Sequence, residues 1–423
     1  MLIANGCYGT VNDTRTTQGN TMIIAPKIRG FICTTAHPTG CFQHVKSQVD
    51  YIKSHRVASR PLNVLVIGAS TGYGLASRIS SAFGHQANTI GVAFEKPASG
   101  KRTASAGWYN TAAFEQLAHA DGLYAKSING DAFSHAIKQS TIDLIREDWG
   151  HVDLLVYSLA SPRRTDPDTG EAFSSVLKPI GETYTNKTID PFSGVVSEVS
   201  LELASDEEVA ATVKVMGGED WQLWVDALQS ANLLAPSFKT VAYSYIGPEL
   251  THPIYTNGAI GQAKQHVQQT ADRLNTMLAD EVQGQAFCSV NKAVVTQSSA
   301  AIPVVPLYIA ILFKVMQEQG VHEDCIEQMH RLLNEYLYAA SPSALDAARC
   351  IRLDDKEMEA SIQAAVATAW ETVTTDNIDS LADLTAYRDG FLQLFGFGLE
   401  GVDYDADVDP VVPIPSIEAV EAV

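Results

Sequence analysis

The stretch "VLVIGASTGYGLASR", from Val64 to Arg78, combines an apolar run with three closely spaced glycines and a helix-forming segment. The apolar run is typical of a buried strand, and the glycines permit a tight turn in which backbone N–H groups approach a pyrophosphate at a helix N-terminus. Glycines alone are also compatible with a purely structural turn, but the strand and helix around them favour dinucleotide binding. The residues predicted to bind the cofactor here are Gly68, Ser70, Gly72, Tyr73 and Gly74.

The same alternation of short apolar strands and helices continues along the chain. Strands are expected at 62–70, 88–94, 124–129, 152–160, 237–247 and 285–295, and helices at 72–84, 110–122, 134–150, 206–216, 219–234 and from 259 onward. Strands that alternate with helices form βαβ crossovers, in which a parallel sheet is covered by helices on both faces. The predicted fold class is therefore α/β, a doubly wound parallel sheet of the Rossmann type.

Three additions to this core are expected. Residues 1–60 resemble a hairpin followed by a helix, residues 162–200 form a polar insertion at the carboxyl edge of the sheet, and helices dominate 301–400. With the core at 61–300, we predict one enlarged domain over residues 1–400. The acidic segment 401–423 is expected to be a loosely held tail.

Composition excludes several classes of protein. The net charge of −20 makes nucleic acid and anionic membranes poor partners. The longest apolar run, from Ala300 to Phe313, is too short for a spanning helix and contains two prolines, so stable membrane insertion is not expected. The six cysteines are scattered without zinc-ligand spacing, which favours a reduced cytoplasmic protein without a metal. These cysteines are Cys7, Cys33, Cys41, Cys288, Cys325 and Cys350.

The ends of later strands supply the rest of the expected cofactor site. Phe94 and Glu95 end the second strand, and Glu95 lies 21 positions after Gly74, where a carboxylate accepts hydrogen bonds from an adenine-ribose diol and repels a 2′-phosphate. This favours NADH, although the nearby cluster Lys96, Lys101 and Arg102 is equally able to bind that phosphate or to be a solvated loop. Further cofactor contacts are expected from Asp131, Ala132, Leu159 and Ala160.

The stretch "YTNGAIGQAK" places Tyr255 and Lys264 nine positions apart across an Asn-Gly turn. On one continuous helix the two side chains would lie on opposite faces. We expect Tyr255 to precede the helix and Lys264 to lie in its second turn, so that both reach one site. A tyrosine can donate a hydrogen bond to a developing oxyanion, and an adjacent lysine can lower the pKa of the tyrosine and bind ribose hydroxyls.

The Tyr255-x8-Lys264 spacing, the "GASTGYG" loop and the segment "SYIGPELTHPIYTNGAIGQAK" together resemble the FabV-type enoyl-acyl carrier protein reductases and the related trans-2-enoyl-CoA reductases. The resemblance runs from "IIAPKIRGFICTTAHPTGC" near the start to "YRDGFLQLFGFGL" near the end. It implies a short-chain-dehydrogenase-like domain that reduces the double bond of a 2-enoyl thioester with NADH in fatty acid biosynthesis.

The resemblance also implies roles for individual residues. Tyr255 is the expected acid or enolate-stabilising donor, and Lys264 is its cofactor-holding partner. Tyr245 is expected to assist at the thioester carbonyl, and Thr296 to form part of the nicotinamide wall. Packing and loop roles remain open for Tyr245 and Thr296. The apolar run from Ala300 is expected to wall the acyl chain, with simple core packing as the alternative.

Two other functions stay open at this point: a short-chain-dehydrogenase-type ketoreductase and a non-catalytic NAD-sensing protein. A ketoreductase is disfavoured because no Tyr-x-x-x-Lys spacing occurs, and a sensor because both Tyr255 and Lys264 are present. The carrier of the acyl group is either coenzyme A or acyl carrier protein, with Arg163, Arg164 and Lys187 as candidate contacts. We take a monomer as the expectation for the oligomeric state, which the sequence leaves open.

Overall fold

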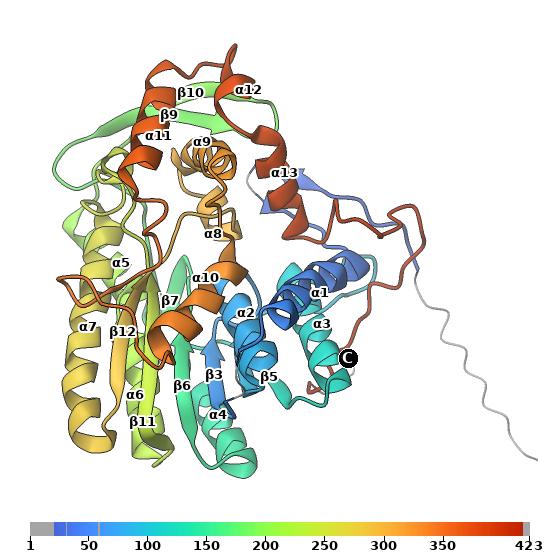
Figure 1. Ribbon diagram of the computed structural model, residues 1–423, viewed down its shortest axis with the longest axis vertical. Helices are drawn as coiled ribbons and strands as arrows, with labels where there is room; N and C mark the ends of the chain where they lie inside the picture. The colour runs from blue at the N-terminus through green and yellow to red at the C-terminus, as the bar shows by residue number, and fades with distance from the viewer. Residues whose placement is uncertain (1–20, 31, 58–59, 418–423) are drawn as a thin grey trace, which may run out of the picture.

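A computed structural model of the chain describes residues 21–30, 32–57 and 60–417. Its centre is a seven-stranded, wholly parallel sheet, which confirms the predicted α/β class (Figure 1). Across the sheet the strands are β13 (Ile351–Arg352), β12 (Gln285–Val290), β11 (Leu234–Ser244), β6 (Val152–Tyr157), β3 (Asn63–Ile67), β4 (Asn88–Ala93) and β5 (Ala125–Asn129).

Helices bury both faces of the sheet, and alternate residues of β3 pack into two separate hydrophobic cores. Val64 and Val66 pack on one side, whereas Leu65 and Ile67 pack on the other. The first side is covered by α1 (Pro38–Ser54), α2 (Gly72–Ile79), α3 (Ala106–Ala120) and α10 (Cys325–Arg331). The second side is covered by α4 (His135–Asp148), α6 (Glu219–Ser230) and α7 (Ala259–Val282).

The chain order reverses between β3 and β6, because β4 and β5 lie on one side of β3 and the later strands lie on the other. In doubly wound sheets ligands bind in the crevice at this switch point, outside the carboxyl ends of the strands. The predicted insertion begins there as two antiparallel hairpins, followed by α5 (Asp206–Met216). The hairpin strands are β7 (Arg163–Thr165), β8 (Ala172–Ser174), β9 (Tyr184–Asp190) and β10 (Val195–Leu201).

A cap of helices lies above the carboxyl edge of the sheet, with the β9–β10 hairpin over α9 (Figure 1). The cap consists of α8 (Gln297–Ala300), α9 (Val305–Glu318), α11 (Ala360–Thr372), α12 (Ile378–Leu381) and α13 (Leu384–Gln393). Most of α9 is buried in a core that it shares with the hairpin and with α11, which agrees with the core-packing alternative for the apolar run. No helix in the described part of the chain is long and apolar enough to cross a membrane.

The expected N-terminal hairpin is present as β1 (Ile28–Arg29) and β2 (Ile32–Cys33), and α1 follows it. Residues 1–20, which include Cys7, and residues 58–59 of this segment lie outside the described residues. The other five cysteines are free thiols.

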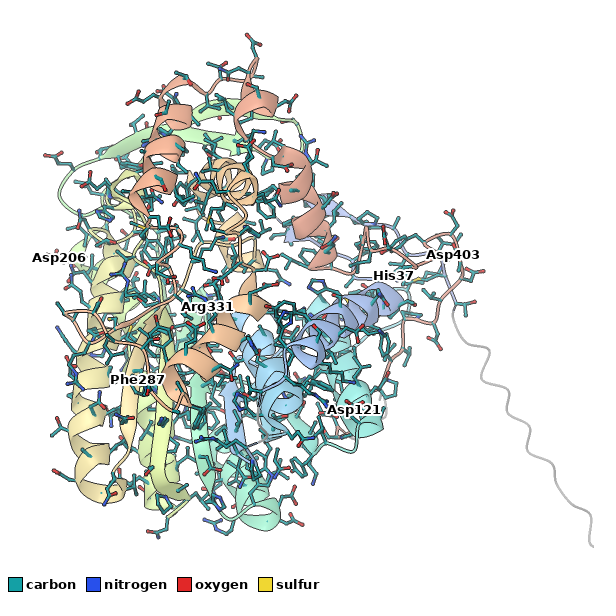
Figure 2. The ribbon with its side chains drawn as sticks, in the orientation of Figure 1. His37, Asp121, Asp206, Phe287, Arg331 and Asp403 are labelled. Carbon is teal, nitrogen blue, oxygen red and sulfur yellow. The ribbon has the colours of Figure 1, made fainter. Side chains whose placement is uncertain are left out.

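The expectation of a loosely held tail is wrong for the described residues 401–417. Tyr109 donates to the Pro410 carbonyl at 2.7 Å, and Trp108 Nε1 donates to the Val412 carbonyl at 2.7 Å. Ile414 is only 2% exposed. Figure 2 shows Asp403 beside His37 at the start of α1, where the next residue, Tyr404, stacks edge-on with the His37 ring. The acidic composition predicted solvation, but apolar residues between the aspartates anchor the segment.

Ser416, near the end of the described residues, contacts a buried carboxylate. Glu115 is fully buried, and its two oxygens accept hydrogen bonds from the Ser416 hydroxyl at 2.7 Å and the Ser416 N–H at 2.8 Å. The Ser416 oxygen also accepts a hydrogen bond from the backbone N–H of Ser127 on β5 at 2.8 Å. The tail therefore completes the hydrogen bonding of a charged group inside the domain.

We expect Ser416→Ala to lower the free energy of unfolding by about 1–3 kcal/mol, because a buried donor and a buried acceptor lose their partner. Urea unfolding measures this change. The matched control is Ser140→Ala on the exposed face of α4, where the hydroxyl bonds only the carbonyl one turn earlier and the change should stay within about 0.5 kcal/mol. Equal stability of the two variants would show that the tail contact contributes nothing.

Candidate active site

One large cavity of about 1210 Å³ opens at the carboxyl ends of β3, β4, β5, β6, β11 and β12. It spans the switch point between β3 and β6, where a doubly wound fold binds its ligand. Every residue predicted for the site lines this cavity except Gly74, which packs behind the turn. The lining residues among them are Gly68, Ser70, Gly72, Tyr73, Phe94, Glu95, Asp131, Ala132, Leu159, Ala160, Tyr245, Tyr255, Lys264 and Thr296.

The glycine turn between β3 and α2 is shaped by backbone packing. A Cβ on Gly74 would lie 1.9 Å from the Gly68 carbonyl oxygen, and a Cβ on Gly68 would lie 2.4 Å from the Ser158 carbonyl oxygen. Gly72 differs, because a Cβ there would make only an ordinary contact of 3.8 Å with the Thr296 methyl group, and its positive φ of 52° is what favours glycine. The Tyr73 hydroxyl donates to the Lys292 carbonyl at 2.6 Å, which ties α2 to the opposite cavity wall.

The two glycines therefore predict different penalties. Gly74→Ala should lower the free energy of unfolding by more than about 3 kcal/mol, because the backbone must move to admit the methyl group. Gly72→Ala should cost about 1–2 kcal/mol from the left-handed conformation alone. Urea unfolding measures both changes. A larger loss from Gly72→Ala than from Gly74→Ala would contradict this account of the turn.

Glu95 is held in place by two serine hydroxyls at the end of β4. Ser70 donates to its Oε1 at 2.6 Å and Ser105 donates to its Oε2 at 2.5 Å. Asn129 accepts from the Glu95 N–H at 2.7 Å and donates to its carbonyl at 3.0 Å, which fixes the backbone as well. The carboxylate thus presents a fixed negative charge to the cavity, as the NADH interpretation requires.

The competing basic cluster stays outside the cavity. Lys96, Lys101 and Arg102 are exposed, and none of the three is among the lining residues. Phe94, by contrast, lines the cavity with 76% of its surface exposed, an unusual position for a large apolar side chain. A flat aromatic ring at the cavity rim is suited to contact with a planar base.

The loop after β5, with Asp131 and Ala132, is supported by a buried ion pair that sequence reasoning missed. Lys138 Nζ donates to the carbonyls of Ala132 and Phe133 at 2.9 and 3.0 Å, and to Asp220 Oδ1 at 2.7 Å. Lys138 and Asp220 are 3% and 1% exposed. Burial lowers the pKa of Lys138, and Asp220 opposes that shift. Nothing in the sequence pairs these two residues, which lie on α4 and α6.

Tyr255 precedes α7, as predicted, in a turn stabilised by a hydrogen bond from its N–H to the Thr251 carbonyl at 2.9 Å. The side chain is 8% exposed and lines the cavity. Its hydroxyl makes no hydrogen bond to any described residue. Burial raises the pKa of Tyr255, so the hydroxyl keeps its proton at neutral pH. The arrangement leaves a donor available to a bound ligand.

Lys264 lies in the second turn of α7, also as predicted, and Nζ donates to the Tyr243 carbonyl at 3.1 Å. Burial lowers its pKa, and Cys288 opposes that shift. An ammonium has three donor hydrogens, so two remain for a ligand. No hydrogen bond joins Lys264 to Tyr255 in the described part of the chain. The expected lowering of the pKa of Tyr255 by this lysine is therefore wrong, because desolvation of the tyrosine prevails.

Tyr245 and Thr296 line the same cavity as Tyr255 and Lys264. The Tyr245 ring meets the Tyr255 ring edge to face, with centroids 5.0 Å apart and planes at 83°. The Thr296 hydroxyl accepts from the Ser299 N–H at 3.0 Å and caps α8. The Thr296 methyl group faces the Gly72 turn across the cavity. Both residues thus have structural contacts in addition to their place in the cavity wall.

One face of α9 forms an apolar side of the same cavity. Val305, Ile309 and Phe313 recur every four residues along that face, and Gln317 follows them. Residues at i and i+4 lie on one side of a helix, so the spacing was readable from the sequence. The run was predicted to wall an acyl chain, but the individual residues were not singled out. The cavity therefore combines a polar half at the glycine turn with an apolar half at α9.

Of the three cations proposed to contact an acyl carrier, the structure leaves one available. Arg164 is buried and donates to Glu219 and to the Lys214 carbonyl, both at 2.7 Å. Lys187 Nζ donates to the carbonyls of Trp370, Glu371 and Val373 at the end of α11. Only Arg163 is exposed and lines the cavity. The expectation for Arg164 and Lys187 is wrong, because the folded chain already uses both charges.

Comparison with known proteins places this site in a family. A family model described as the trans-2-enoyl-CoA reductase catalytic region matches residues 102–338, more than half of the chain, and one described as the NAD(P)H binding domain of trans-2-enoyl-CoA reductase matches 23–100. The chain belongs to the trans-2-enoyl-CoA reductase family. An enoyl-[acyl-carrier-protein] reductase [NADH] of Coxiella burnetii is 59% identical over 398 residues, covering 94% of this chain and 98% of the relative.

Solved structures agree with this membership. The Treponema denticola trans-2-enoyl-CoA reductase in complex with NAD has a TM-score of 0.88 and 50% identity, covering 93% of this chain and 100% of that chain. A Clostridium trans-2-enoyl-CoA reductase in complex with NADH has a TM-score of 0.91 and 41% identity, with the same two coverages of 93% and 100%. The family resemblance stated from the sequence motifs is confirmed.

A third family model, described as an enoyl reductase FAD binding domain, matches residues 345–408. The residues in this segment do not fit a flavin site of their own. Its strand β13 has two residues and is not followed by a glycine turn, and the Gly396 backbone packs directly against Gly40 of α1. Helix α13 instead contributes Ala386 and Gly390 to the wall of the cavity described above.

Proposed function

We propose that this protein reduces the carbon–carbon double bond of trans-2-enoyl thioesters with NADH. The observation that carries the proposal is the Tyr255 hydroxyl, which keeps its proton and has no partner among the described residues, inside a cavity shared with the glycine turn. A dinucleotide turn supplies a place for a hydride donor. A protonated, unpartnered hydroxyl supplies a donor for the negative charge that follows hydride addition.

The cofactor is expected to bind along the polar half of the cavity. NADH supplies a hydride to the β-carbon of the substrate when it is bound. The pyrophosphate would lie on the Gly68–Gly74 turn at the start of α2, where N–H groups converge. Glu95 would accept from the adenine ribose, Phe94, Asp131 and Ala132 would surround the base, and Leu159, Ala160 and Thr296 would line the nicotinamide half.

Tyr255 and Lys264 divide the work at the reacting centre. Hydride addition at the β-carbon moves negative charge to the thioester oxygen, and the Tyr255 hydroxyl stabilises that oxygen by donating its proton in a hydrogen bond. Lys264 would hold the cofactor ribose with the donor hydrogens that the Tyr243 carbonyl does not use. The α-carbon then takes a proton from water, which gives the saturated thioester.

The acyl chain of the substrate would bind in the apolar half of the cavity, against Val305, Ile309 and Phe313 on one face of α9. Both coenzyme A and acyl carrier protein present a phosphate on the pantetheine arm, and Arg163 is the cavity cation available to it. We place the reaction in the cytoplasm, as part of fatty acid biosynthesis. The five free thiols of the described residues support a reducing compartment.

Tyr255→Phe is expected to lower kcat by about 10²-fold or more, the scale of losing one oxyanion donor, and to leave NADH affinity nearly unchanged. Lys264→Ala should weaken both turnover and NADH affinity, because its amine would contact the cofactor ribose. The double variant should lose less than the sum of the two separate free-energy changes, since residues that act as a unit are non-additive. Steady-state kinetics with crotonyl-CoA and fluorescence titration of NADH measure these effects.

The control for this series is Tyr336→Phe, since Tyr336 lies outside the cavity and bonds the Arg352 carbonyl at 3.4 Å. It should retain the turnover of the unmodified protein. Near-normal turnover of Tyr255→Phe, or strict additivity in the double variant, rejects the shared role. Faster turnover of a matched 3-ketoacyl thioester than of crotonyl-CoA rejects the proposed reaction itself.

NADH should be used more efficiently than NADPH, because the Glu95 carboxylate repels a 2′-phosphate. Glu95→Gln should reduce the ratio of kcat/KM for NADH over NADPH by about tenfold or more, since one unit charge near the phosphate is removed. Glu147→Gln, an exposed carboxylate at the end of α4, is the matched control and should leave the ratio unchanged. An unchanged ratio in Glu95→Gln would assign the preference to another group.

A further inference from the structure

A buried carboxylate accepts a hydrogen bond from Tyr245 behind the cavity wall. Glu357 is in the segment between β13 and α11 and is fully buried. Its Oε1 accepts hydrogen bonds from the hydroxyls of Tyr245 at 3.1 Å and Tyr308 at 2.7 Å, and its Oε2 accepts from the Ala293 N–H at 2.7 Å. Glu357 itself does not line the cavity, whereas Tyr245 and Ala293 do.

The contacts of Glu357 suit its ionised form. A buried charge is costly unless it is paired and hydrogen-bonded, and here three donors converge on two oxygens. Lys292, which is 3% exposed, supplies a nearby positive charge. Burial raises the pKa of Glu357, and Lys292, Tyr308 and the Ala293 N–H oppose that shift. Asp354 acts with burial to raise the pKa, and it is the three converging donors that set the carboxylate as an acceptor.

The hydrogen bond from Tyr245 has a consequence for the cavity. A phenol has one proton, so the Tyr245 hydroxyl that donates to Glu357 cannot donate to a ligand at the same time. Its ring lines the cavity and meets the Tyr255 ring edge to face, while its hydroxyl is engaged by Glu357. Tyr255 has no such partner among the described residues, so the two tyrosines differ in what they can offer a thioester oxygen.

We propose that Glu357 is a positioning residue that withholds the Tyr245 proton from the cavity, so that the thioester oxygen is bound by Tyr255 alone. This inference rests on the proposed function for its catalytic meaning. It replaces the expected assistance of Tyr245 at the thioester carbonyl with a role as a ring support for Tyr255. Glu357 carries no sequence signal for this role, since it lies 112 positions from Tyr245.

Glu357→Gln tests the inference, because a carboxamide that keeps its oxygen on the Ala293 N–H turns its NH₂ group toward Tyr245. Tyr245 must then accept, and its proton turns into the cavity as a second donor. We expect kcat to fall about tenfold while KM for crotonyl-CoA stays equal or falls, the signature of added ground-state binding. In a Tyr245→Phe background the same change should alter kcat by less than about twofold.

The matched control is Tyr308→Phe, which removes the other hydroxyl from the same carboxylate oxygen and does not line the cavity. It should keep kcat within about threefold of the unmodified protein. An equal loss of kcat from Glu357→Gln in the presence and absence of the Tyr245 hydroxyl would show a structural role only. A raised KM with unchanged kcat would also overturn the proposal.

A spectroscopic test separates this inference from the proposed function. With tyrosines labelled with ¹³C at Cζ, the resonance lost in Tyr245→Phe identifies Tyr245, and Glu357→Gln should shift that resonance and leave Tyr255 in place. An unmoved Tyr245 resonance overturns the inference even if the enzyme is active. Absence of turnover on both enoyl-CoA and enoyl-acyl carrier protein overturns the proposed function alone. If Glu357→Gln does not fold, Glu357→Asp should shift the same resonance, because its shorter side chain withdraws from the Tyr245 hydroxyl.

Discussion

The approach of the Gly74 backbone to the Gly68 carbonyl oxygen sets the geometry on which the site depends. A Cβ at Gly74 would lie 1.9 Å from that oxygen, so α2 can begin directly above the end of β3 only without a side chain there. The helix N-terminus then faces the switch point of the sheet. The strand-end residues of β4, β5 and β6 meet around it because their strands share one edge with β3.

Buried polar groups hold this arrangement from behind. Arg78 of α2 is 1% exposed and donates to Ser127 Oγ at 2.8 Å and the Lys126 carbonyl at 2.6 Å, which fastens α2 to β5. Lys138 holds the loop after β5, and Glu357 holds Tyr245 and the wall at Ala293. Burying a charge costs free energy, and removing one partner of a buried charged group is strongly destabilising because it leaves the other partner uncompensated. Each of these groups stabilises a position in the cavity wall that backbone packing alone does not fix.

The cavity has a polar half and an apolar half, and the apolar half is built by segments added to the Rossmann core. The Rossmann core provides a polar surface for a dinucleotide, but a strand edge provides no apolar slot for an acyl chain. Helix α9 adds an apolar side to the cavity with Val305, Ile309 and Phe313, where we propose that the acyl chain binds. The helix is enclosed in turn by the β9–β10 hairpin and by α11, which bury its other faces. The insertion and the C-terminal helices thus together hold α9 against the cavity.

The sequence by itself determined the features that arise from local physics. The strand–glycine–helix stretch at 64–78, the βαβ alternation and the position of Lys264 in the second turn after an Asn-Gly turn depend on neighbours within one or two turns of chain. Only the tertiary structure decided which charged side chains are buried or paired and which remain available to a ligand. It paired Lys138 with Asp220 across 82 positions, buried Arg164, anchored the acidic tail through Ser416 and set Glu357 behind Tyr245. Desolvation and hydrogen bonding depend on which distant segments pack together, and the local pattern of residues does not contain that information.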